Sequence, residues 1–234
     1  APLRTGRLFA DRLITSMRTG GDGEAVALAL ETSLARAEAM VERLLLLATL
    51  REGRPQPTLV ALSAAVDQVA TELVADLDDV GGRFSVEADG PVLIDRTLFG
   101  DLLRHLAENS IRYRSTERPL LVRFWTEITD STTELVVRDN GVGIAPQYQD
   151  RVFRLFERLE NGDGADAPDA SADGLGFGLA CCRRIVELHR GTIAMVSPSD
   201  GIGAECRITL PAHPGSAQLE PQPSVSGQPR PADN

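Results

Sequence analysis

Apolar residues in the first fifty positions recur with the spacing of two amphipathic helices. Phe9, Leu13 and Met17 stand at i, i+4 and i+8 and share one helical face. After the glycine-rich break at 18–23, a second apolar series has a heptad-like rhythm: Val26, Leu30, Ser33, Ala37, Met40, Leu44 and Leu47. A hairpin of this kind cannot bury both apolar faces by itself, so we expect a second copy to complete a four-helix bundle. Packing of both helices onto the rest of the same chain is the alternative.

A boundary at Gly53–Pro57 separates this hairpin from a mixed pattern of helical and alternating segments. The pattern predicts helices, strands and antiparallel hairpins in an α/β sandwich with a mixed sheet and helices on one face. The predicted helices are 63–77, one from Arg96, a short one near 151–159, and 177–189. The predicted strands are a short pair near 84–87 and 92–94, a hairpin of 120–128 and 132–139, and a last pair, 192–197 and 205–211.

The chain is therefore expected to have the α+β class and three parts. These are a dimerisation hairpin (1–53), a globular domain (54–213), and a tail (214–234) rich in Pro, Ser, Gly and Gln that is expected to be disordered.

Composition narrows the possible functions. The net charge of −10 argues against nucleic acid as a partner. The three cysteines form no CxxC pattern, which leaves no indication of a zinc site or a disulfide scaffold. No segment approaches the ~20 apolar residues of a membrane span.

An asparagine stands where the pattern of one predicted helix expects a core residue. Leu102, Leu106, Asn109 and Tyr113 share one stripe of the segment that ends in HLAENSIRYR. A buried amide left unpaired costs roughly 1–3 kcal/mol, so Asn109 on a leucine stripe needs a reason.

Two glycine-rich segments follow. Asp139 ends a predicted strand and begins DNGVGIAP, where Gly141 and Gly143 would let backbone approach a ligand; an ordinary Asn-Gly turn is the alternative. DGLGFGLA (173–180) opens a helix, and free amides at a helix N-terminus favour phosphate; a flexible loop is the alternative. A Walker P-loop is excluded because the chain has no lysine, and the GxGxG spacing does not fit a Rossmann fingerprint.

Together these segments resemble the ATP-binding catalytic domain of sensor histidine kinases, within the GHKL ATPases. The resemblance covers about Thr58–Pro211 and includes an N box (HLAENSIRYRS), a G1 box (DNGVGI), an F box (RVFRLFERL) and a G2 box (GLGFGLACCRRIVELHRG). YRSTERP and RVFRLFERL look most like the phytochrome-type branch. The resemblance implies a Bergerat-type fold for the sandwich.

The resemblance also implies a set of residues that bind the cofactors ATP and Mg²⁺. Asn109 would ligate the Mg²⁺ that bridges the ATP phosphates, and Asp139 would accept a hydrogen bond from the adenine amino group. Phe153 and Phe156 would hold the lid on the domain, and Arg158 would reach the terminal phosphate. The whole nucleotide-binding set is Asn109, Arg112, Tyr113, Asp139, Gly141, Gly143, Ile144, Phe153, Phe156, Arg158, Gly174, Leu175, Gly176, Gly178 and Leu179.

Two positions at the expected catalytic centre depart from the usual motif or vary within it. Arg112 stands where the family usually has lysine, and it still brings positive charge to phosphate oxygens. His105 stands four residues before Asn109, where it would polarise a pocket water or lie near the phosphates; a local hydrogen bond is the alternative. Of the remaining large or titratable residues, His189 is expected in a helix cap, His213 carries no signal, and Trp125 is expected to fill the sheet core.

The resemblance implies a phosphoacceptor histidine on the first helix of the hairpin, which is not one of the three histidines of this chain. APLRTGRLFADRL resembles the sequence that directly follows the phosphoacceptor box. Either the chain is truncated by a few residues, which the intact pocket motifs favour, or the protein is a degenerate relative that cannot phosphorylate itself.

The expected function is ATP-dependent histidine kinase activity in a two-component system, with transfer onward to an aspartate of a response regulator receiver domain. The other expected partners are a second copy of the chain and an upstream sensory domain, and the expected location is the cytoplasm. The alternatives are a non-catalytic dimeric phosphotransfer or scaffold protein, and another GHKL ATPase or protein-serine kinase. Intact Asp139 and Asn109 count against the first, and His105 in place of an acidic residue counts against the second.

Overall fold

The computed structural model describes residues 27–28, 34, 54–155, 176–212 and 222–223. The chain divides into two compact units, one of Ala1–Gly53 with Phe156–Phe177 and the other of Arg54–Leu155 with Gly178–Asn234. The expected hairpin lies outside the described residues except for three helical positions, and so does most of the expected disordered tail.

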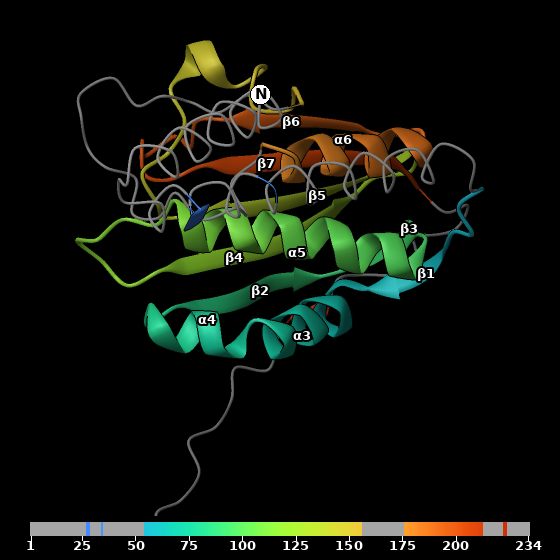
Figure 1. Ribbon diagram of the computed structural model, residues 1–234. Coiled ribbons are helices and arrows are strands. Elements are labelled where there is room, and N and C mark those ends of the chain that lie inside the picture. Colours follow the sequence, from blue (N-terminus) through green and yellow to red (C-terminus); the bar gives the residue numbers. More distant parts are fainter. Residues whose placement is uncertain (1–26, 29–33, 35–53, 156–175, 213–221, 224–234) are drawn as a thin grey trace, which may run out of the picture. The chain divides into compact units, whose positions relative to one another are not determined.

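The second unit contains both helices and strands (Figure 1). In chain order they are β1 (Thr58–Ala61), α3 (Leu62–Glu72), α4 (Val74–Asp79), β2 (Arg83–Asp89), β3 (Pro91–Ile94), α5 (Arg96–Arg112), β4 (Leu121–Ile128), β5 (Thr132–Asp139), the 3₁₀ helix η1 (Pro146–Tyr148), α6 (Gly178–Leu188), β6 (Thr192–Val196), β7 (Glu205–Pro211) and β8 (Gln222–Pro223).

The strands form one mixed sheet of six, in the order β6-β7-β5-β4-β2-β8, and a separate pair, β1-β3. Only β2 and β4 pair in parallel, because α5 lies in the connection between them; the other neighbours in the six-stranded sheet pair antiparallel. The predicted α+β class, the mixed sheet and the β4–β5 hairpin are confirmed.

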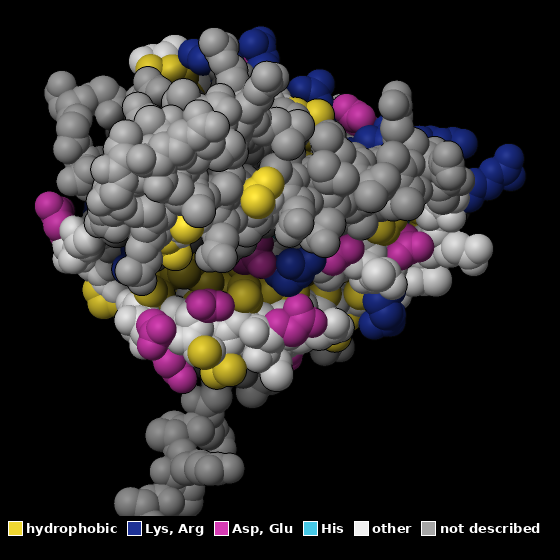
Figure 2. Space-filling model, viewed as in Figure 1, with side chains coloured by type: hydrophobic (Ala, Val, Ile, Leu, Met, Phe, Trp, Pro, Cys, Tyr) yellow, Lys and Arg dark blue, Asp and Glu magenta, His cyan; other side chains and the backbone are white. Residues whose placement is uncertain are grey.

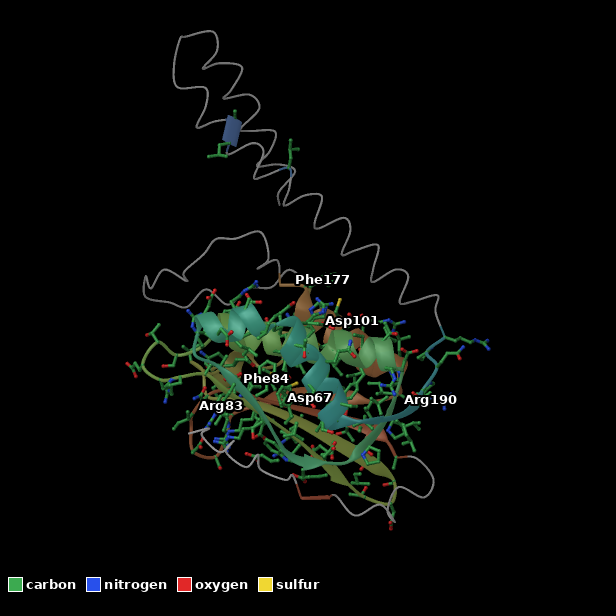
Figure 3. All side chains as sticks on the ribbon, turned by 90° about the horizontal axis from the view of Figure 1, so that it is seen from below. Asp67, Arg83, Phe84, Asp101, Phe177 and Arg190 are labelled. Atoms are coloured by element: carbon green, nitrogen blue, oxygen red, sulfur yellow. The ribbon has the colours of Figure 1, made fainter. Side chains whose placement is uncertain are left out.

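The helices α3, α5 and α6 lie on one face of this sheet (Figures 1 and 3). Along β4, Val122, Phe124 and Thr126 are buried while the residues between them are not, as expected of a sheet with one covered face. The buried apolar layer between sheet and helices includes Phe99, Leu102, Leu103, Leu106, Leu135, Ile185, Ile208 and Leu210.

Trp125 does not fill the sheet core, contrary to our expectation. It alternates with the buried Phe124 and Thr126, is only half-buried, and donates its indole N–H to Glu127 Oε1 at 3.1 Å. The core position belongs to Phe124, whose ring lies 5.4 Å from that of Phe84 in an edge-on arrangement. The period of two along β4 therefore decides which aromatic residue is buried.

Two predicted helices differ from the structure. The single helix expected at 63–77 is two helices separated at Leu73, which has φ −102° and ψ 16°. The short helix expected near 151–159 is absent from its described part, where residues 151–155 form turns after η1.

The strands predicted at 84–87 and 92–94 exist but do not pair with each other. Gly90 separates them, and they join different sheets: β2 pairs with β4, and β3 pairs with β1. Strand β1, which the four-residue apolar pattern is too short to reveal, was missed.

Exposed carboxylates gather on α3 and α4, over the part of the surface that Figure 2 shows with acidic side chains. The exposed acidic residues of these helices are Asp67, Glu72, Asp76, Asp78 and Asp79. Neither helix contains a basic residue, so these two helices contribute only negative side-chain charge to the surface. No helix within the described residues is long and apolar enough to cross a membrane.

Candidate functional site

A half-buried carboxylate lies where β5 ends. Oδ1 of Asp139 accepts hydrogen bonds from the backbone N–H of Gly141 at 2.8 Å and of Ala204 at 3.0 Å. Its Oδ2 lies 3.4 Å from Oγ of Ser110, which is also 3.1 Å from the carbonyl of Leu106, so the hydroxyl proton is shared between two acceptors. Oδ1 is thus held by two firm donors, while Oδ2 has one weak partner among the described residues and can accept more.

Burial raises the pKa of Asp139 above its usual value. The hydrogen bonds from Gly141, Ala204 and Ser110 and the charge of Arg138 oppose this rise without cancelling it. A carboxylate that remains partly desolvated gains most from a further hydrogen-bond donor.

Glycines allow two loops to meet around Asp139. Gly143 and Gly203 both have φ of +77°, which favours glycine over any residue with a side chain. A Cβ on Gly203 would lie 1.9 Å from the carbonyl oxygen of Asp139, and one on Gly141 would lie 2.4 Å from that of Tyr113. A side chain at either of these two positions would push the loops apart.

The last turn of α5 lies beside this carboxylate through Ser110. The next residue towards the N-terminus, Asn109, is half-buried, and its Nδ2 is buried without a hydrogen-bond partner in the described part of the chain. A buried donor without a partner costs free energy, so Nδ2 of Asn109 is a candidate contact for a ligand.

One turn earlier, His105 belongs to a charged cluster on α5. Its Nδ1 lies 3.5 Å from Glu108 Oε2, and Arg104 lies 3.4 Å from Oε1 of the same residue. The hydrogen bond from His105 lowers the pKa of Glu108 although burial opposes the shift. A Cβ on Gly178 would lie 3.6 Å from His105 Nδ1, so His105 lies against the start of α6.

The first turn of α6 has the features of an anion site. The helix begins at Gly178 with no acidic residue in its first turn, and Gly176 before it has a φ of +66°. The free N–H groups and the dipole of such a helix start favour a phosphate group. The predicted glycines Gly176 and Gly178 therefore lie at a helix start, as the sequence indicated.

The remaining predicted residues lie at varied depths. Arg112 is exposed in the last turn of α5, Tyr113 caps that helix with 47% of its surface exposed, and Phe153 is buried. Ile144 and Leu179 are half-buried. Phe156, Arg158, Gly174 and Leu175 lie outside the described residues.

Sequence reasoning missed three contributors to the site: Ser110, Gly203 and Ala204. Ser110 lies inside the N box directly after Asn109, and the sequence analysis assigned a role to Asn109 alone. The other two belong to DGIGAE (200–205), whose paired glycines before a strand could have indicated a second loop against Asp139.

Comparison with known proteins identifies the family. The family described as "Histidine kinase-, DNA gyrase B-, and HSP90-like ATPase" matches residues 94–214. The chain is 33% identical over 153 residues to cyanobacterial phytochrome A of Nostoc, covering 65% of this chain and 19% of that protein. It is 31% identical over 220 residues to the sensor-like histidine kinase SenX3 of Mycobacterium tuberculosis, covering 90% of this chain and 50% of that protein.

A solved structure supports the fold. The crystal structure of histidine kinase ThkA in complex with the response regulator protein TrrA aligns with a TM-score of 0.63 and 16% identity, covering 92% of this chain and 58% of that one. The chain belongs to the histidine kinase-, DNA gyrase B- and HSP90-like ATPase family. Within that family its domain is of the sensor histidine kinase type, as the motifs indicated.

Proposed function

We propose that this domain binds ATP, with Asp139 as acceptor for the adenine amino group. The observation that carries the proposal is the arrangement of Asp139: Oδ1 is held by two backbone N–H groups, and Oδ2 keeps accepting capacity in a partly desolvated position. Adenine presents an amino donor that such an oxygen would bind, and Gly141 would let the base pass close to the backbone.

Asn109 fits a magnesium ion bound together with the phosphates. The oxygen of its side-chain amide is a kind of ligand that Mg²⁺ accepts, and its buried, unsatisfied Nδ2 would donate a hydrogen bond to a phosphate oxygen. No group of three His, Cys, Asp or Glu side chains in the described residues could hold a metal, so the phosphates would supply the other ligands, as is usual for Mg²⁺. When bound, the ion would neutralise charge on the phosphate oxygens.

The other residues of the site would position the triphosphate. The N–H groups at the start of α6 would bind phosphate oxygens, and Arg112 would add positive charge from the last turn of α5. His105, held by Glu108 against Gly178, would keep its side of the pocket polar near the phosphates. These roles need no covalent step on the part of the domain, because positioning and charge neutralisation carry most of the catalysis of phosphoryl transfer.

The reaction that this site supports is transfer of the γ-phosphoryl group of ATP to a histidine and then to an aspartate of a response regulator. The names of the relatives and the ThkA–TrrA complex support the receiver-domain partner. The chain spans 19% of the phytochrome and 50% of SenX3, so a sensory domain elsewhere in the natural protein forms part of the proposal. Because the acceptor histidine is not one of the three in this chain, the test supplies it on a separate hairpin: acid-labile radiolabel that moves from ATP to that histidine and then to a receiver domain would establish the sequence of steps.

The apolar stripes of residues 1–53 support assembly through a four-helix bundle. Light scattering should therefore give twice the mass of one chain, and a mass of 25.1 kDa would contradict the proposed homodimer.

Calorimetric titration of the full chain with ATP, with and without Mg²⁺, tests the site. The unaltered chain should bind ATP more tightly with Mg²⁺, and Asn109→Ala should lose that gain while keeping its Mg²⁺-free affinity within about twofold, because only the metal ligand is removed. Gln68→Ala, which removes an exposed amide from α3, is the matched control and should behave like the unaltered chain. An equal Mg²⁺ effect in Asn109→Ala would contradict the metal assignment, and no ATP binding by the unaltered chain would contradict the function.

A further inference from the structure

Asn140, the residue after Asp139, forms hydrogen bonds with the segment that leads into β4. Nδ2 of Asn140 donates to the carbonyl of Pro119 at 2.9 Å, and its Oδ1 accepts from the N–H of Leu121 at 2.9 Å. The side-chain amide thereby takes one acceptor and one donor of a neighbouring segment, as a paired strand residue would. Both polar groups of Asn140 thus form hydrogen bonds within the protein, which ties this side chain to a neighbouring segment.

The segment that Asn140 holds connects α5, which carries Asn109, to β4. Residues 114–120 run from the end of α5 to β4, and they are tied to the G1 turn at both ends. At the first end, the N–H of Val142 donates to the carbonyl of Tyr113 at 3.1 Å. At the other end, Asn140 holds Pro119 and Leu121. The G1 turn and the helix that carries Asn109 are therefore joined through this connection.

The opposite side of Asp139 is held by a different loop. Arg138, the residue before Asp139, forms an ion pair with Asp200, and Asp200 Oδ1 accepts from the N–H of Ile202 at 3.1 Å. This loop leads to Ala204, whose N–H reaches Asp139 Oδ1. Arg138 thus holds the loop that contains Asp200, and Asn140 holds the connection 114–120. Loss of the Asn140 side chain would release the end of this connection next to β4.

We propose that Asn140 is a positioning residue that sets base selectivity by holding the carboxylate of Asp139 in place for the amino group of the base. The proposal rests on the proposed function and adds a residue that does not touch the nucleotide. Asn140 acts through the backbone of the G1 turn, because a shift of that turn moves Asp139 relative to Ser110 and Ala204. A contact that depends on one hydrogen bond weakens steeply when its geometry is lost.

The test compares ATP with inosine triphosphate, which has the same triphosphate but a carbonyl in place of the amino group. Calorimetry on the full chain gives the ratio of the two affinities for each variant. Asn140→Ala removes both hydrogen bonds. Asn140→Asp keeps the acceptor for Leu121 but places an oxygen without a proton against the carbonyl of Pro119. Thr126→Val is the control, since it removes a buried hydrogen bond to Gly90 of 2.8 Å in the same sheet, away from the site.

The unaltered chain and Thr126→Val should show the same preference for ATP. Both Asn140 variants should lose about tenfold of that preference, with inosine triphosphate affinity kept within about twofold, because the hydrogen bond to the base is what they lose. Equal weakening of both nucleotides, or an unchanged preference, would overturn the positioning role while leaving ATP binding in place. Failure of the unaltered chain to bind ATP would overturn the proposed function and this inference with it.

Discussion

The burial of Asp139 is costly for the fold, and in the proposed function this cost favours binding of a donor. A carboxylate in a partly desolvated position is less stable than in water, which is why burial raises its pKa. The fold offsets only part of this cost with the N–H groups of Gly141 and Ala204. The remaining electrostatic cost is what a donor on a ligand would relieve.

The raised pKa of Asp139 predicts how ATP binding depends on pH. In the proposed site the ionised carboxylate is the acceptor, so ATP affinity should be full above the folded pKa of Asp139 and should fall as pH decreases through it. Because burial raises this pKa, the fall should begin at a higher pH than for an ordinary aspartate. ATP affinity measured by calorimetry between neutral and mildly acidic pH checks this.

Titration of the nucleotide itself also weakens binding in acid, and Asp139→Asn is the control for it. The variant should keep only the part of the pH dependence that comes from ATP. If the unaltered chain and Asp139→Asn lose affinity in parallel as the pH falls, the carboxylate is not the acceptor.

Among the elements, α5 serves the core and the site with different turns. Its carboxylate cap at Asp95 accepts from the N–H groups of Thr97 and Leu98, its middle buries Leu102 and Leu106, and Asn109 lies near its end. His189, just after α6, accepts the N–H of Asp95 on Nε2 at 3.0 Å and donates from Nδ1 to Ile185. The expected cap role of His189 is confirmed and extended, since it joins the end of α6 to the start of α5.

Removal of the α5 cap should destabilise the domain. Asp95→Ala should lower the free energy of unfolding by about 1–2 kcal/mol at neutral pH, because two N–H groups of the first turn and that of Gln56 lose their acceptor. Burial acts to raise the pKa of Asp95, but these hydrogen bonds lower it overall, so the stabilisation should be present at neutral pH and lost as pH falls through the lowered pKa. Denaturant unfolding at several pH values measures both effects.

Asp101→Ala on the same helix is the matched control for the cap. Its carboxylate pairs with Arg104 at the surface, and loss of such a pair should change the free energy of unfolding by no more than about 0.5 kcal/mol. Equal destabilisation by the two substitutions would show that the cap of α5 contributes no more to the free energy of unfolding than a surface ion pair.

The elements that the sequence predicted well are long and strongly periodic. Helix α5 and the β4–β5 hairpin have clear periods of 3.6 and 2 and adjacent partners. The errors in strand pairing lie where partners are distant in the chain: β2 pairs with β4 across α5, and β1 pairs with β3 across two helices and β2. Local pattern does not report such pairing, and the four residues of β1 are too few to show a period.

At the scale of the whole molecule, the motif spacing indicated which distant segments form the site. The structure brings the N-box helix next to the G1 aspartate through Ser110, and the start of α6 next to His105. The paired glycines of DGIGAE (200–205) could have indicated a loop near Asp139, but they could not show that the N–H of Ala204 donates to it, because a backbone N–H has no signature in the sequence. Asn140 was read as part of a turn, and only the fold shows that its amide joins the turn to the start of β4.

The central claim is that Asp139 binds the base of ATP, and its most direct test is the ATP affinity of Asp139→Asn. Asparagine can keep the bonds from Gly141 and Ala204 on its oxygen, with the amide group facing Ser110, so the site should keep its shape. Because the ionised carboxylate is destabilised by burial at neutral pH, loss of its charge should not lower the free energy of unfolding.

Calorimetry of both proteins with Mg²⁺ and ATP at neutral pH therefore compares two folded domains that differ in one acceptor. We predict that Asp139→Asn binds ATP at least about tenfold more weakly than the unaltered chain. Equal affinity of the two proteins would contradict the account.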